Sequence, residues 1–190
     1  MADQPTVVQD DVVELLLHQH GQIHDLFAEV RTSEAEARRH AFGRLVRLLA
    51  MHETAEEMIV HPVARTVLPG GSGVVDDRMA EEEPAKEMLS RLESLGPDDP
   101  DFLPLLEQLR LAVLAHARAE ERYEFIKLRE VMDAATLAQL ARAVKAAEAV
   151  APTHPHPGID TTTENLVAGP AAAVVDRVRD EVRRALSDSP

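Results

Sequence analysis

Two segments of the sequence each carry a histidine followed four residues later by a glutamate: His52 with Glu56, and His116 with Glu120. On a helix, residues four apart project from the same face one turn apart, so each pair can present an imidazole and a carboxylate to one site. The histidine can then bind one metal ion while the glutamate reaches across to a second. Because glutamate is frequent in this chain, one such pair arises readily by chance, and the pairs carry weight only through their surroundings.

Both pairs lie on apolar faces of helices that the sequence predicts. Apolar residues recur at alternating spacings of three and four over four segments, about 8–30, 33–64, 75–95 and 101–132. His20 interrupts the apolar stripe of the first segment, and Glu82 interrupts that of the third. Burying such groups without partners would cost several kcal/mol each, which a domain with about 5–15 kcal/mol of net stability cannot absorb. We therefore expect six side chains to face one another: His20, His52, Glu56, Glu82, His116 and Glu120.

Imidazoles and carboxylates that converge inside a helical bundle are typical of a carboxylate-bridged pair of metal ions. A buried hydrogen-bonded network without metal is the alternative. Since the chain has no cysteine, any metal must be held by nitrogen and oxygen. These ligands suit iron or manganese, and zinc is a further option. In this interpretation His20 and Glu82 complete the shell of one ion or are divided between the two.

Two further histidines are candidate metal ligands. His24 follows His20 by four residues, and it either coordinates a metal ion or orients a carboxylate ligand. His61 stands directly before Pro62, where it could coordinate a metal ion, cap the helix end or line the entrance to the site.

Glutamates near these residues leave alternatives open. Glu81 competes with Glu82 as a ligand, because Pro84 can kink the predicted helix and rotate its first turn. The glutamates that flank the two pairs are expected to be solvated or to support the ligands; these are Glu53, Glu57, Glu121 and Glu124.

The composition favours an all-α protein. The chain has 190 residues, of which 45% are hydrophobic and only 3% aromatic, and Ala, Leu, Glu and Arg predominate. Its formal net charge of -14 argues against a nucleic-acid or anionic membrane partner. The amino terminus lacks the pattern of a signal peptide, and no run approaches about 18 apolar residues. We therefore expect a cytoplasmic protein, either a monomer or a homodimer.

The predicted organisation is a helical bundle over residues 8–132 followed by an extension over residues 133–190. In the extension we expect a short helix near 133–149, a Pro-rich connection and a last helix over 171–186 that packs on the bundle. His154 and His156 lie in the Pro-rich connection, and we interpret them as loop residues rather than metal ligands.

The segments "LLLHQHGQIHDLF", "HETAEEMIVHP" and "HARAEERYEF" resemble the hemerythrin-like cation-binding domain, over about residues 10–132. The resemblance implies an up-and-down antiparallel four-helix bundle that holds two non-haem iron ions with oxo or hydroxo bridges; manganese and zinc are the alternatives. It also implies that five residues stand at ligand positions: His20, His52, Glu56, His116 and Glu120.

The third predicted helix departs from the family pattern. Oxygen-carrying hemerythrins place two histidines there, whereas this chain has Glu82 and, four residues later, Lys86. A site richer in carboxylates favours turnover over reversible oxygen carriage. We therefore expect a redox enzyme that reacts with oxygen or hydrogen peroxide. The alternative is a protein that binds or senses iron, oxygen or nitric oxide without turnover.

Overall fold

The computed structural model describes residues 11–151, and every regular element in that range is a helix. In chain order the elements are α1 (Val12–Thr32), α2 (Ala35–Ala55), η1 (Glu56–Val60), α3 (His61–Val67), α4 (Gly71–Leu95), α5 (Phe102–Glu120), η2 (Glu121–Phe125), α6 (Ile126–Val131) and α7 (Ala134–Glu148). The labels η1 and η2 denote single π-helical turns, and each continues the helices on either side of it. The expected all-α class is confirmed.

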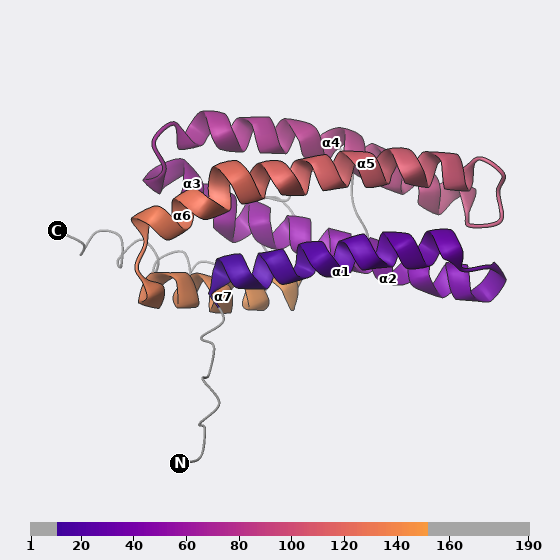
Figure 1. Cartoon of the computed structure of the whole chain (residues 1–190), viewed down its shortest axis with the longest axis horizontal. Helices are drawn as coiled ribbons and strands as arrows, with labels where there is room; N and C mark the ends of the chain where they lie inside the picture. Colours follow the sequence, from indigo (N-terminus) through magenta and orange to yellow (C-terminus); the bar gives the residue numbers. More distant parts are fainter. Residues whose placement is uncertain (1–10, 152–190) are drawn as a thin grey trace, which may run out of the picture.

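These helices form an up-and-down four-helix bundle, as predicted. Its four members are α1, then α2 continued through η1 and α3, then α4, and finally α5 continued through η2 and α6 (Figure 1). α1 packs along α2, and α4 packs along α5. Short connections reverse the chain, and two glycines with positive φ, Gly70 (φ 72°) and Gly96 (φ 76°), lie next to the two ends of α4. Glycine adopts this conformation without the strain that a β-carbon introduces.

Two hydrophobic clusters fill the bundle and leave a polar layer between them. On α1, Leu16 belongs to one cluster and Ile23 to the other, with His20 between them. The same order holds along α5 and η2, where Val113 and Phe125 lie in different clusters and the second histidine–glutamate pair falls between them. Because apolar packing on both sides holds the helices in register, the polar side chains of the layer have fixed neighbours.

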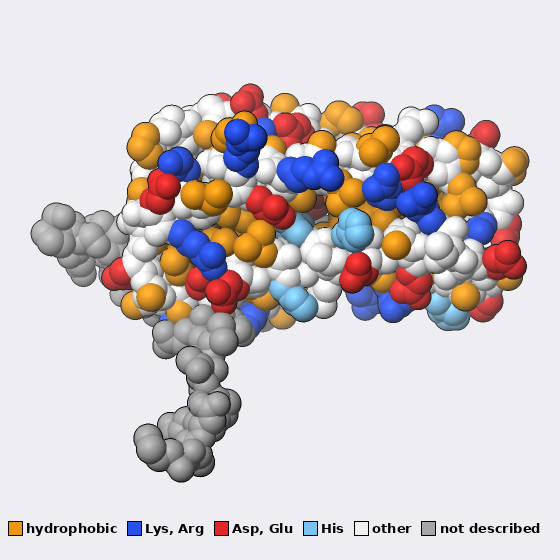
Figure 2. Space-filling view, in the orientation of Figure 1, with side chains coloured by type: hydrophobic (Ala, Val, Ile, Leu, Met, Phe, Trp, Pro, Cys, Tyr) orange, Lys and Arg blue, Asp and Glu red, His pale blue; other side chains and the backbone are white. Residues whose placement is uncertain are grey.

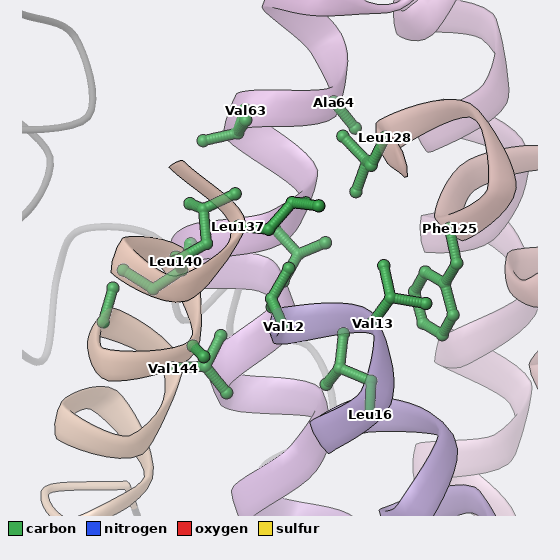
Figure 3. Packing of buried hydrophobic residues seen from close by; sticks show 14 of the residues in the cluster. Val12, Val13, Leu16, Val63, Ala64, Phe125, Leu128, Leu137, Leu140 and Val144 are labelled. Carbon is green, nitrogen blue, oxygen red and sulfur yellow. The ribbon is translucent and has the colours of Figure 1, made fainter. Parts of the chain in front are cut away.

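α7 adds a further helix against α1, α2 and η1. Its residues Leu137, Leu140 and Val144 share a hydrophobic cluster with Val12 and Leu16 (Figure 3). The helix begins at an N-cap, Asp133, whose side chain accepts a hydrogen bond of 2.8 Å from the backbone of Thr136. The domain boundary at residue 132 stays a prediction. The expected last helix, the Pro-rich loop and its two histidines lie outside the described residues.

The π-helical turns change which residues face the interior. In η1 the backbone N–H of His61 bonds to the carbonyl of Glu56, five residues earlier. In an α-helix five residues span about 500°, which would turn His61 about 140° away from Glu56. The wider turn brings both to the same face, and His61 is buried. Pro62 has no N–H with which to continue an α-helical ladder at this point, which gives a physical reason for the irregular turn.

Within residues 11–151, no helix combines the length and the apolar character needed to cross a lipid bilayer.

Candidate metal centre

Four ligand atoms meet in the polar layer, one each from His20, His52, Glu56 and Glu120, and all lie within 4.8 Å of one another. We call this group the four-ligand subsite. The Nε2 atoms of His20 and His52 are 3.1 Å apart. Glu56 Oε2 lies 3.3 Å from the Nε2 of His52, and Glu120 Oε2 lies 3.4 Å from that of His20. All four residues are buried.

Neighbouring side chains fix the orientation of both imidazoles. The Nδ1 of His52 lies 2.9 Å from the amide oxygen of Gln19, which can only accept, so this nitrogen carries a proton. The Nδ1 of His20 lies 2.9 Å from Glu121 Oε1 in the same way. Both Nε2 atoms are thereby turned toward the centre of the subsite, where a proton or a metal cation must separate them. Hydrogen bonding of the far ring nitrogen is typical of metal-ligating histidine.

A second group, the three-ligand subsite, joins Glu53, Glu82 and His116. Glu120 links it to the four-ligand subsite, because its Oε1 lies 3.3 Å from the Nε2 of His116 while its Oε2 faces His20. A carboxylate with one oxygen toward each of two groups is placed to bridge two ions.

His61 occupies a third corner of the layer, where both of its ring nitrogens face carboxylates. Its Nδ1 lies 3.1 Å from Glu124 Oε1, and its Nε2 lies 3.2 Å from Glu82 Oε1. His61, Glu120 and Glu124 also have ligand atoms within 4.8 Å of one another. With a carboxylate at each ring nitrogen, His61 can be an imidazolium that donates twice, or it can lose one proton and bind a metal ion through that nitrogen.

Lys86 already neutralises part of this region. Its Nζ donates to Glu82 Oε2 at 3.0 Å and also to Glu57 Oε1. Glu82, predicted as a ligand, is therefore held by both Lys86 and His61. A cation that binds to Glu82 must share this carboxylate with groups that are already bound to it.

The structure shows where the other sequence candidates lie. Glu82 faces the interior, whereas Glu81 is 42% exposed and accepts from the Nδ1 of His116 at 3.1 Å. Glu81 therefore orients His116. His24 does not join the cluster: its side chain is 60% exposed, and Nδ1 lies 3.3 Å from its neighbour Asp25. Four residues of α-helix advance about 400°, so His24 is rotated by about 40° from His20, toward solvent.

Sequence reasoning did not select Glu53 and Glu124 as ligands. Both were expected to be solvated or to support the ligands, yet each contributes an atom to a group that could hold a metal, and Glu124 is fully buried. Glu124 lies inside η2, so its direction depends on a turn that a period of 3.6 residues does not describe.

The unsatisfied buried atoms fit metal cations. Both carboxylate oxygens of Glu56 and of Glu120 are buried without a hydrogen-bonding partner among the described residues, and so is the Nε2 of His116. Glu53 and Glu124 each leave one such oxygen. Buried polar atoms are rarely left in this state, because each costs the desolvation that it has lost. Nitrogen and carboxylate oxygen together suit iron or manganese.

Burial and mutual charge shift the titration of these groups strongly. Burial, together with the charges of His20 and His116, lowers the pKa of His52 to about 3, which keeps this ring neutral. Burial also opposes protonation of His116, but the Glu120 carboxylate outweighs it and the pKa rises to about 10. Burial raises the pKa of Glu53 to about 8, with a contribution from Glu82.

The pKa values of the two buried glutamates Glu56 and Glu120 shift in opposite directions. Burial beside Glu120 raises the pKa of Glu56 well above its usual range. For Glu120, the histidines His116 and His20 outweigh burial and lower the pKa well below its usual range. A proton on Glu56 and one on His116 therefore supply positive charge in place of a metal cation. A bound cation would displace both protons.

Histidine side chains reach the surface near the middle of the face on which α1 and α5 lie in front (Figure 2). Acidic and basic side chains are interspersed over the same face. The histidines of the two subsites contribute little to this surface, because His20, His52 and His116 are each at most 7% exposed.

A helical bundle with an inward layer of histidine and glutamate defines a class of cation-binding proteins. The sequence model of the Hemerythrin HHE cation binding domain matches residues 11–128, and the chain belongs to this family. The resemblance that the motifs indicated is thereby confirmed. α7 lies beyond the matched residues.

Two curated relatives share part of the sequence. An uncharacterised hemerythrin-like protein of Schizosaccharomyces pombe is 27% identical over 138 residues, which cover 72% of this chain and 68% of that protein. A DNA nickase of Nostoc sp. is 26% identical over 139 residues, which cover 73% of this chain but only 39% of the nickase.

A solved structure shares the fold. The crystal structure of a hemerythrin HHE cation binding domain-containing protein from Mycobacterium kansasii matches with a TM-score of 0.65 at 22% identity. The match covers 74% of this chain and 86% of that chain.

Proposed function

We propose that the chain is a non-haem di-iron protein that reacts with oxygen or hydrogen peroxide. The observation that carries this proposal is the four-ligand subsite, where the Nε2 atoms of His20 and His52 face each other at 3.1 Å between two carboxylates without hydrogen-bonding partners among the described residues. In the proposal Glu120 bridges to a second ion at the three-ligand subsite. Manganese and zinc remain the alternative metals.

Bound iron would relay electrons, either from one hydrogen peroxide molecule to a second, which yields water and oxygen, or from a small oxidisable substrate to oxygen. The protein would bind the ions, exclude bulk water and hold protons nearby. His61 is suited to the last task, because the carboxylates of Glu124 and Glu82 outweigh its burial and raise its pKa to about 10. At neutral pH this ring therefore holds a proton at Nε2, 3.2 Å from Glu82 Oε1.

Small molecules are the proposed partners, in preference to nucleic acid. The net charge of -14 would repel a phosphate backbone. The match to the Nostoc DNA nickase covers only 39% of that protein, and we do not extend the nickase activity to this chain.

The proposal is tested by loading the metal-free chain with iron and measuring hydrogen peroxide consumption. We expect catalytic consumption above that of the same amount of free iron, and rapid oxidation of the ferrous protein in air. The matched control is His52→Ala, treated identically. Iron bound at this site without peroxide consumption above the control, and with reversible oxygen binding, would reject the enzyme and leave a binding or sensing role. Absence of bound iron would reject both.

A further inference from the structure

Gln19 connects the metal centre to α7. Its amide oxygen lies 2.9 Å from the Nδ1 of His52, and its amide nitrogen donates to Glu148 Oε1. Gln19 is 6% exposed and its bond to His52 is buried, so water competes little for that bond, while Glu148 is half-buried. Glu148 is the last residue of α7, a helix that lies outside the residues matched by the family.

The direction of the Gln19 amide determines which nitrogen of His52 is available to a metal. An ionised carboxylate can only accept, so Glu148 selects the NH₂ group of Gln19 and leaves the amide oxygen facing His52. That oxygen also can only accept, so Nδ1 of His52 carries the proton and Nε2 keeps its lone pair. If the amide were reversed, its NH₂ would face Nδ1, and the proton would move to Nε2, toward the subsite.

We propose that Glu148 is a positioning residue for the metal ligand His52, acting through Gln19, and that α7 is therefore part of the metal centre. The inference rests on the proposed metal binding at the four-ligand subsite. The place of Glu148 supports it, because a negative charge at the carboxyl end of a helix is opposed by the helix dipole and needs another reason to be there. Leu140 and Val144 anchor α7 in the apolar cluster and hold Glu148 beside Gln19.

The test uses the full chain and two variants of equal size. In Glu148→Gln, the new amide can donate or accept, so it no longer determines the direction of Gln19. In the double variant Gln19→Glu with Glu148→Gln, residue 19 becomes a carboxylate that can only accept from His52, while residue 148 can donate to it. Arg142→Gln, an exposed change on α7, is the control for altered charge.

Two quantities are measured: the tautomer of His52 in the metal-free chain, by nitrogen-15 NMR of the ring, and the dissociation constant of the first Co²⁺ ion. For Glu148→Gln we expect a mixture of tautomers and about tenfold weaker binding, as for other partners of ligating histidines. The double variant should return to one tautomer and to the parent affinity, and Arg142→Gln should change neither quantity.

Co²⁺ binding and a His52 tautomer that are unchanged in Glu148→Gln would overturn the inference while leaving metal binding established. A double variant that keeps its thermal stability but does not recover either quantity would also overturn it. A parent chain that binds no Co²⁺ at all would instead reject the proposed function, so the two failures are distinguishable.

Discussion

The two subsites of the polar layer differ in how much positive charge the protein itself supplies. In the four-ligand subsite, Glu56 and Glu120 have carboxylate oxygens without hydrogen-bonding partners among the described residues, and two imidazoles face inward. In the three-ligand subsite there is one imidazole, and Glu82 is already bonded to Lys86 and His61. Counted over residues 11–151, an entering cation meets more carboxylate oxygens without partners in the first subsite than in the second. We therefore expect two ions of unequal affinity.

The largest effect is expected at the carboxylate that the subsites share. Glu120→Gln removes the charge that faces both His20 and His116, so it should lower the affinity for both ions. Loss of a residue that only hydrogen-bonds to a metal ligand lowers affinity roughly 10–100-fold, and loss of the shared ligand should cost more. Metal analysis after equilibration with iron measures this loss. Glu34→Gln, an exposed change at the start of α2, is the control and should retain both ions. Retention of either ion at parent affinity would show that Glu120 does not bridge.

Substitution of a single histidine should remove the ion of one subsite and not that of the other. His52→Ala should prevent binding at the four-ligand subsite, whereas His116→Ala should remove the weaker ion and spare the stronger one. The metal-to-protein ratio of each purified variant reports the difference. His24→Ala serves as the comparison, because this exposed side chain does not reach the layer, and it should leave the ratio unchanged. Equal losses in the two inner variants would contradict the division into subsites.

A rise in pH should lower the stability of the metal-free chain and raise the affinity for the second ion. The folded-state pKa values of His61 and His116 are raised to about 10, above the value of 6.5 for an unfolded histidine. Their contribution to stability is thus fully present below pH 6.5 and is lost as the pH rises toward 10. Metal binding must displace the proton on His116, so the affinity for the second ion should rise by up to about tenfold per pH unit over the same range.

Thermal unfolding at several pH values, with and without metal, measures both trends. The metal-free chain should lose stability between pH 6.5 and 10, and the stabilisation by added metal should grow. His116→Gln should reduce the slope of the affinity for the second ion. A second-ion affinity that falls over this range would contradict the assignment of a proton to His116.

The smallest change in metal affinity is expected on substitution of Lys86. Lys86→Met keeps the length of the side chain but removes the charge bonded to Glu57 and Glu82, so the second ion should bind at least about tenfold more tightly. A unit charge about 4 Å away is worth between about 1 kcal/mol in water and about 4 kcal/mol at an effective dielectric constant of about 20, and about 1.4 kcal/mol corresponds to tenfold. Lys86→Arg keeps the charge and should remain close to the parent. Metal titration of both variants measures the change. If Lys86→Met bound the second ion less tightly, the lysine would support the site rather than compete with its metal.

The periodicity of the sequence was sufficient to predict the bundle and the inward direction of most ligands. His20, His52, Glu56, Glu82, His116 and Glu120 all lie in the layer because each replaces an apolar residue on a stripe with α-helical spacing. His24 follows His20 by four residues but is rotated by about 40° toward solvent, so spacing alone did not decide whether it is a ligand. The division of the six residues between two subsites depends on which helices are adjacent, and one helix at a time carries no such information.

The π-helical turns explain two residues that the sequence did not settle: His61, whose role it left open, and Glu124, which it did not select as a ligand. The inward direction of His61 and Glu124 depends on where η1 and η2 widen the helix. Pro62 was a usable signal for η1, since a proline inside a helix disturbs the ladder before it. Nothing comparable marks η2, whose residues "ERYEF" contain neither proline nor glycine. The contact between Gln19 and α7 joins residues 129 positions apart, and no local pattern predicts it.

Anaerobic calorimetric titration of the metal-free chain with ferrous ions tests the central claim most directly. The account predicts two ions per chain in two resolved steps, the tighter one lost in His52→Ala and the weaker one in His116→Ala. A single ion per chain, or two ions of equal affinity that neither substitution separates, would contradict it.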